Sequence, residues 1–91
     1  MADIEVRSAD PGETSTFAVR VSEGGGHTEH EVTLSESDAF NLASGYPSKE
    51  EFIRACFEFL LEREPKESIL RRFDVSVISR YFPEFEERIR R

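Results

Sequence analysis

Apolar and polar positions follow a helical period over Ser48–Arg63, the longest apolar-rich run of the chain. At about 100° per residue, four polar residues share one narrow arc and the apolar residues cover the rest of the circumference. Such a wide apolar arc predicts a helix that is packed on two or three sides. Ser48 and Glu51 form a capping-box pair at its start, and Pro65 ends it. The polar arc consists of Glu51, Arg54, Glu58 and Glu62.

Three shorter segments alternate apolar and polar residues, which is typical of half-buried strands. They lie around Ile4–Val6, Phe17–Val21 and Thr28–Leu34. Asp10-Pro11-Gly12 predicts a turn between the first two segments, and Gly24-Gly25-Gly26 predicts a hairpin turn between the last two. The simplest assembly is an antiparallel meander with one apolar face, which leaves three charged side chains on the solvent face. These are Arg20, Glu29 and Glu31.

Further short helices are predicted on both sides of the central one. Ser35 and Asp38 form a capping-type pair before a helix over Glu36–Ser44, which Gly45 ends. We expect Phe40, with Ala39 or Ala43, to face inward.

After Pro65, the apolar spacing predicts a helix of about two turns over Lys66–Phe73. Asp74 or Ser76 is expected to cap another short helix, which Pro83 interrupts before a last turn that carries Phe85 and Ile89.

Together these elements predict an α+β fold. We expect a three-stranded antiparallel β-meander followed by a helical C-terminal two-thirds, with the helices packed on one face of the sheet. The length of 91 residues indicates a single domain, 1–91, in which residues 1–14 form a loosely ordered arm.

Composition indicates a small soluble protein. Eight Phe and no Trp make phenylalanine the main core residue, and a single Cys excludes an internal disulfide. The start of the chain has no basic segment followed by an apolar run, and no segment has the length of a membrane span. We therefore expect a cytoplasmic protein with no membrane association.

Charge is unevenly distributed along the chain, whose net charge is −7. Residues 1–62 carry a net charge of −9, and residues 63–91 carry +2. The acidic part disfavours nucleic acid and anionic lipid, so only the C-terminal third could contact a polyanion.

His27–Glu31 contains side chains that can bind metals. On a strand, however, His27 shares one side with Glu29 and Glu31, and His30 points to the other. We expect a polar strand face beside a glycine turn and no metal site. The glycines also lack the Gly-Lys-Ser/Thr sequence of a phosphate loop.

Cys56 is the one candidate nucleophile with a reactive thiol, but it lies in the middle of the apolar helix. A thiol buried there has a raised pKa and is normally inert. No catalytic serine sequence is present, and the adjacent carboxylates lie on helices as solvated faces. We expect no catalytic residues, no cofactor and no enzymatic activity.

The run Phe73-Asp74-Val75-Ser76, followed by Ile78-Ser79-Arg80-Tyr81, resembles the turn and recognition helix of bacterial helix-turn-helix repressors. The resemblance implies a DNA-binding protein with a degenerate helix-turn-helix in residues 66–82. It implies that Ser76, Ser79 and Arg80 face the DNA groove and that Arg71 and Arg72 touch phosphates. The sequence departs from the pattern because a single residue separates the two runs, Pro83 shortens the second helix, and glutamates follow it.

The longer segment Glu62–Arg88 is similar to small bacterial proteins with no assigned function, and this likeness implies no activity. Our main hypothesis is a non-catalytic, cytoplasmic protein-interaction or regulatory module, with another protein as its partner. Aromatic residues dominate such interfaces. The candidate partner-binding residues are Tyr46, Tyr81, Phe82 and Phe85. The alternative is that these aromatic side chains belong to the core.

Overall fold

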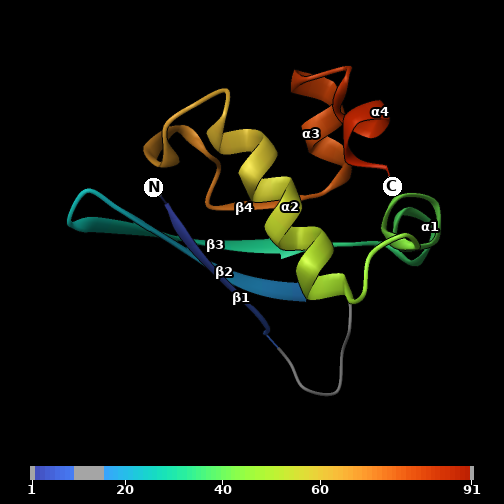
Figure 1. Ribbon diagram of the computed structural model, residues 1–91, viewed down its shortest axis with the longest axis horizontal. Helices are drawn as coiled ribbons and strands as arrows, with labels where there is room; N and C mark the ends of the chain where they lie inside the picture. Colours follow the sequence, from blue (N-terminus) through green and yellow to red (C-terminus); the bar gives the residue numbers. More distant parts are fainter. Residues whose placement is uncertain (1, 10–15, 91) are drawn as a thin grey trace.

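The computed structural model describes residues 2–9 and 16–90, and its sheet has four strands in the order β1-β2-β3-β4 (Figure 1). The strands are β1 (Asp3–Ser8), β2 (Thr16–Glu23), β3 (Gly26–Thr33) and β4 (Arg72–Asp74). β1 and β3 each pair antiparallel with β2, whereas β4 pairs parallel with β3. The fold is therefore α+β with a mixed sheet, and the prediction of a three-stranded antiparallel meander is wrong.

The hairpin between β2 and β3 forms where the glycines predict it. Glu23 pairs with Gly26, and the two residues between them have positive φ angles, 65° at Gly24 and 85° at Gly25. Two consecutive positive φ angles are typical of the turn that matches the twist of a hairpin, and glycine adopts them without strain. One face of the hairpin is buried, while Arg20, Glu29 and Glu31 are exposed as predicted.

β1 pairs with β2 along its whole length, from Asp3 opposite Ser22 to Ser8 opposite Phe17. This part of the predicted arm is a strand of the sheet. The predicted turn at Asp10-Pro11-Gly12 lies outside the described residues.

Helix α2 (Lys49–Leu61) crosses the buried face of the sheet (Figure 1). The Ser48 hydroxyl accepts a hydrogen bond from the Glu51 amide at 3.1 Å, which confirms the predicted cap. The predicted wide apolar arc is buried against the sheet and the C-terminal helices, and the predicted polar arc is exposed. The buried side chains of α2 are Phe52, Ile53, Cys56, Phe57, Phe59 and Leu60.

The segment before α2 begins as α1 (Glu36–Asp38), capped by the Ser35 hydroxyl, and continues as the π-helical turn η1 (Ala39–Ala43). A π-helix carries i→i+5 hydrogen bonds, so it rotates side chains away from their α-helical directions. Leu42 and Ala43 are buried, whereas Phe40 is 79 % exposed. The expectation that Phe40 faces inward is wrong for this reason.

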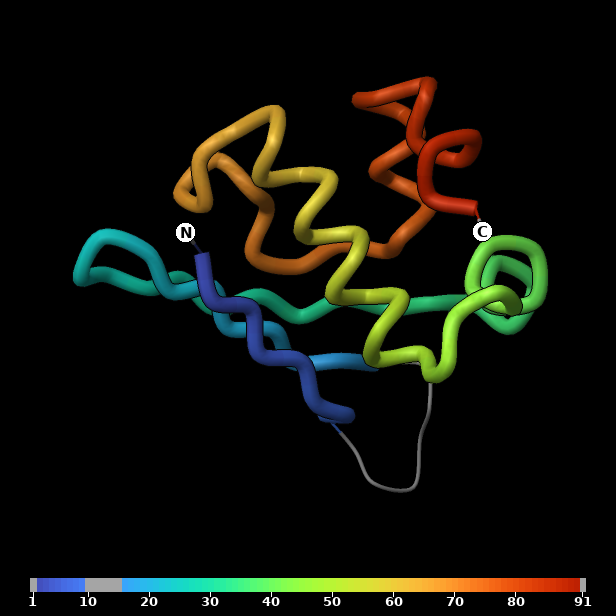
Figure 2. Tube along the Cα trace, in the orientation of Figure 1, coloured from blue at the N-terminus to red at the C-terminus, as the bar shows by residue number. Residues whose placement is uncertain are grey.

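Residues predicted to form a helix over Lys66–Phe73 instead form a short 3-10 turn, η2 (Lys66–Ser68), followed by β4. Helices of this length are marginal by themselves, and propensity is readily overridden by tertiary contacts. Here β4 completes the edge of β3: the Glu31 amide donates to the Arg71 carbonyl at 2.7 Å, and the Val75 amide donates to the Thr33 carbonyl at 2.9 Å. The orange trace of β4 runs beside β3 in Figure 2, although the two are about 40 residues apart in sequence. Because β4 interrupts the helices, the C-terminal two-thirds of the chain is not purely helical.

Two short helices complete the described chain, α3 (Ser76–Tyr81) and α4 (Phe85–Ile89), with Pro83 between them as predicted. Phe85 is fully buried and packs edge-on against Phe59 of α2, with ring centroids 5.1 Å apart. The C-terminal helices therefore pack against α2 through Phe59, beside the sheet.

Candidate binding groove

An apolar groove of about 230 Å³ lies between the C-terminal end of α2, the η2–β4 segment and α3. Leu70 and Tyr81 line it and remain 48 % and 66 % exposed, so large apolar surface stays in contact with water there. Exposed apolar surface that is gathered in a concavity is typical of a binding site. The lining residues are Leu60, Glu64, Ser68, Ile69, Leu70, Phe73, Val77, Ile78, Tyr81 and Phe82.

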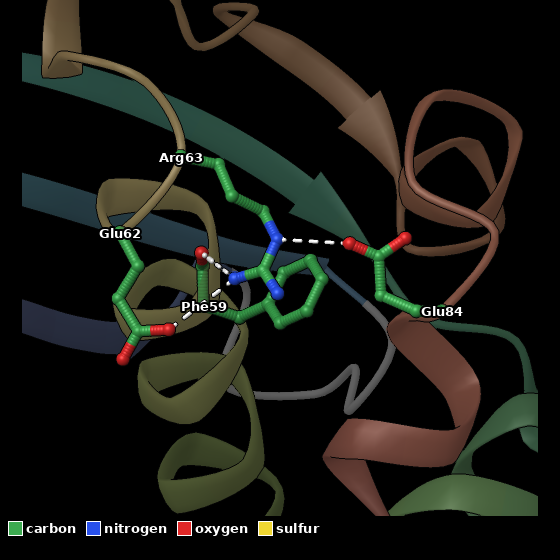
Figure 3. A network of polar contacts seen from close by, with 4 residues as sticks. All are labelled: Phe59, Glu62, Arg63 and Glu84. Carbon is green, nitrogen blue, oxygen red and sulfur yellow. Dashed lines mark hydrogen bonds and ion pairs between the residues drawn. The ribbon is translucent and has the colours of Figure 1, made fainter.

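One wall of the groove is held by Arg63, just beyond α2 (Figure 3). Its guanidinium donates from Nε to Glu84 Oε2 at 3.2 Å and from Nη1 to the Phe59 carbonyl at 3.1 Å. The same group lies 3.6 Å from the centroid of the Phe59 ring and 6.0 Å from that of Phe82. Arg63 therefore ties α2 to the turn before α4 and lies beside Phe82, a lining residue that also packs against Phe59.

The opposite wall is β4, which side chains of β3 hold in place. His30 Nδ1 donates to the Leu70 carbonyl at 2.7 Å, and its Nε2 lies 2.8 Å from the Thr28 hydroxyl. A carbonyl only accepts, so the neutral ring carries its proton on Nδ1 and accepts from Thr28. Burial lowers the pKa of His30; the bond to the Leu70 carbonyl opposes this effect, and the charge of Arg71 adds to it.

Asp74, at the end of β4, joins the sheet to α3. Its carboxylate accepts from the Thr33 hydroxyl at 2.6 Å and from the Ser76 amide at 3.0 Å. Burial by itself would raise the pKa of Asp74, but the hydrogen bonds from Thr33 and Ser76 outweigh it and lower the pKa. The expectation that Asp74 or Ser76 caps this helix is wrong, because Val75 is its N-cap and carries no capping side chain. Asp74 instead accepts from the amide of Ser76, the first residue of α3.

Glu64 is the one charged side chain among the described residues that line the groove. Its carboxylate has no hydrogen bond or ion pair with any residue in the ranges 2–9 and 16–90. Burial raises the pKa of this carboxyl. The groove thus combines an apolar floor with a carboxylate that no residue in the described ranges pairs with.

The four predicted partner-binding aromatics separate into two pairs. Tyr81 and Phe82 line the groove, as a surface for a partner requires. Phe85 lies in the core, and Tyr46 packs edge-on against Phe52 while its hydroxyl donates to the Ile89 carbonyl at 2.6 Å. Tyr46 and Phe85 thus pack with the core, as the alternative interpretation of these aromatic residues expects.

The residues of the helix-turn-helix interpretation do not sit on two helices. Arg71 and Arg72 lie at the start of β4, because the first helix of residues 66–82 does not form. Arg80 and Ser76 are exposed on α3. Ser79 is half-buried, and its hydroxyl lies 3.4 Å from a carboxylate oxygen of Glu86. The helix pair that the resemblance implies is therefore absent from residues 66–82.

The remaining candidates for chemistry are separated from one another. In the described ranges, no group of three or more His, Cys, Asp and Glu side chains comes together. His27 lies 3.6 Å from Glu29 at the surface, while His30 is buried on the other side of the strand. Cys56 is buried, and burial raises its pKa far above the ordinary value.

The roles of Glu64, which lines the groove, and of Arg63 beside it are not evident from the sequence. In the sequence, Arg63 marks only the end of the predicted helix. It lies four residues after Phe59, a separation at which two side chains on a helix can form a cation–π contact. No sequence signal distinguishes Glu64 from the other glutamates around it, because its lack of a partner depends on where Arg63 and Lys66 point.

None of the helices in the described part of the chain combines the length and the apolar character that crossing a bilayer requires. Comparisons of the chain with protein-family models, with curated proteins and with solved structures found no match.

Proposed function

We propose that this chain is a non-catalytic, cytoplasmic protein-interaction module that receives an apolar segment of a partner protein in the groove between α2, β4 and α3. The observation that carries the proposal is the exposure of Leu70 and Tyr81 at the rim of an apolar concavity. Aromatic and aliphatic anchors in a pocket supply most of the free energy of protein–protein binding.

The construction of the groove supports this proposal. Its walls are joined by hydrogen bonds of Arg63, His30 and Asp74 that use no apolar side chain of the lining. A preformed apolar site loses less conformational entropy when a partner binds.

The test is capture of partners from host lysate with tagged protein, before and after nuclease treatment. Leu70→Ser and Tyr81→Ala remove exposed apolar surface from the groove and should each weaken recovery of a partner at least about tenfold, as loss of an interface anchor does. Phe40→Ala is the matched control, because Phe40 is even more exposed but lies outside the groove. A partner that the control retains and both groove variants lose supports the proposal.

Two results would contradict it. Protein recovery that is the same for the groove variants and the wild type would place any interaction elsewhere. Recovery of nucleic acid that disappears after Arg71, Arg72 and Arg80 are changed to Ala, with steep weakening by salt, would support DNA binding instead.

A further inference from the structure

The carboxylate of Glu64 lies in the groove wall with no counterion among the residues that the structure describes, although basic residues are close in sequence. Arg63 is paired with Glu62 and Glu84, both at 3.2 Å. Lys66 is paired with Glu67 at 2.7 Å. Both neighbouring cations are therefore engaged by other carboxylates.

The position of Glu64 just beyond the end of α2 explains why its carboxylate is only partly hydrated. The Glu64 amide donates to the Leu60 carbonyl at 2.9 Å, so the residue continues the last turn of α2 and is fixed at the groove. Its side chain is half-buried among apolar lining residues, and burial raises its pKa. An ionised group that has lost part of its hydration gains the most from a cation that replaces the lost water.

The size of the groove limits what accompanies that cation. A volume of about 230 Å³ is below the roughly 300–1,000 Å³ that pockets for small-molecule ligands usually have, so it suits one large side chain of a peptide. Tyr81, at the rim, adds an exposed aromatic ring, which attracts cations through its face.

We propose that the groove recognises a peptide segment in which a large apolar side chain stands next to a lysine or arginine, with the apolar side chain in the groove and the cation paired with Glu64. This inference rests on the proposed function and adds the chemical class of the partner segment. The choice of a cationic segment follows from charge complementarity, because Glu64 is the one charged lining residue in the described part of the chain.

Three matched dipeptides test this inference by NMR titration of the full-length, isotope-labelled protein at neutral pH. They are Ac-Phe-Lys-NH2, Ac-Phe-Gln-NH2 and Ac-Phe-Glu-NH2, which share the apolar side chain and differ in charge. We expect shifts at Leu70, Ser68 and Tyr81, and affinity for the lysine peptide about fivefold above that for the glutamine peptide, as a partly shielded ion pair provides. The glutamate peptide should bind most weakly.

Glu64→Gln should remove the preference for lysine and keep the groove shifts. Glu58→Gln is the control, since Glu58 is exposed on α2 outside the groove and its replacement should keep the preference. Equal affinity of all three peptides at the groove would overturn the cation assignment and leave the proposed function standing. Shifts confined to other surfaces, or no shifts at millimolar peptide, would overturn both.

Discussion

The two sides of β3 are paired in different ways. On one side, β2 pairs with it antiparallel over eight residues, and the connection is a turn of two glycines. On the other side, β4 pairs with it parallel over three residues, and side chains of His30 and Thr33 supply additional bonds. The first pairing is local and repetitive, whereas the second joins distant segments at a few points. The groove lies on the second side, where three elements meet with incomplete packing.

The largest expected effect comes from Phe57 of α2, whose ring packs against β3 and β4. Phe57 is fully buried, with its ring centroid 5.2 Å from that of His30 and 5.9 Å from that of Phe73. Phe57→Ala should lower the free energy of unfolding by about 3–5 kcal/mol, because it removes buried area and leaves a cavity. Denaturant titration measures this. Tyr81→Ala, in the groove, should change stability by no more than about 0.5 kcal/mol. Equal losses would contradict the distinction between core and groove.

Asp74→Ala tests the seam between β3 and β4, together with its junction to α3. It removes the acceptor for the Thr33 hydroxyl and for the Ser76 amide, so the free energy of unfolding should fall by about 1–3 kcal/mol. Hydrogen exchange should accelerate at the amides of Glu31 and Val75, which bond across the seam, more than within the β2–β3 hairpin. Asp3→Ala is the control, because Asp3 is exposed at the start of β1. Uniform acceleration in both pairings would show that the seam has no separate stability.

His30 should make the same seam sensitive to acid. Its folded-state pKa is lowered from 6.5 chiefly by burial, so the unfolded chain binds a proton more readily as pH falls below that value. The stability that the neutral ring contributes is therefore full above about pH 6.5 and is lost as pH falls toward the lowered pKa, below which both states carry the proton. His30→Gln should abolish this slope in urea titrations repeated across pH, and His27→Gln should retain it. A His30→Gln protein with an unchanged slope would contradict the assignment.

Arg63→Met is expected to have the smallest effect. The substitution keeps apolar contact with Phe59 and removes the ion pairs and the cation–π contact. Stability should fall by about 0.5–1 kcal/mol, with NMR shifts that concentrate at Phe82 and Glu84. Arg54→Met, on the exposed arc of α2, should have no measurable effect on either the stability or these NMR shifts. A larger loss for Arg54→Met would show that Arg63 has no special part in the groove wall.

Sequence patterns predict the local elements well. The Ser48 cap, the apolar arc of α2, the alternation of β2 and β3 and the glycine turn each depend on residues close together in the chain. The failures have nonlocal causes. Leu70 to Asp74 carry no strong strand pattern, and they extend because β3 offers them an open edge. Phe40 turns outward because a π-helical turn replaces the expected α-helix.

The groove is only partly predictable from the sequence. Tyr81 and Phe82 are among the aromatic residues that a small domain could leave exposed, and both line the groove. Tyr46 and Phe85 are aromatic residues of the same kind, but they pack with the core because α4 folds back onto α2. A residue type alone carries no information about which of these positions the chain covers.

The pairing of β4 with β3 is the point on which the groove depends, and nuclear Overhauser effects test it most directly. We predict cross-strand contacts that link Glu31 with Arg71 and Arg72, and Thr33 with Asp74 and Val75, together with extended coupling constants over Arg72–Asp74. Sequential helical contacts throughout Lys66–Phe73, without contacts to β3, would contradict this account. They would restore the first helix of the helix-turn-helix interpretation and remove one wall of the groove.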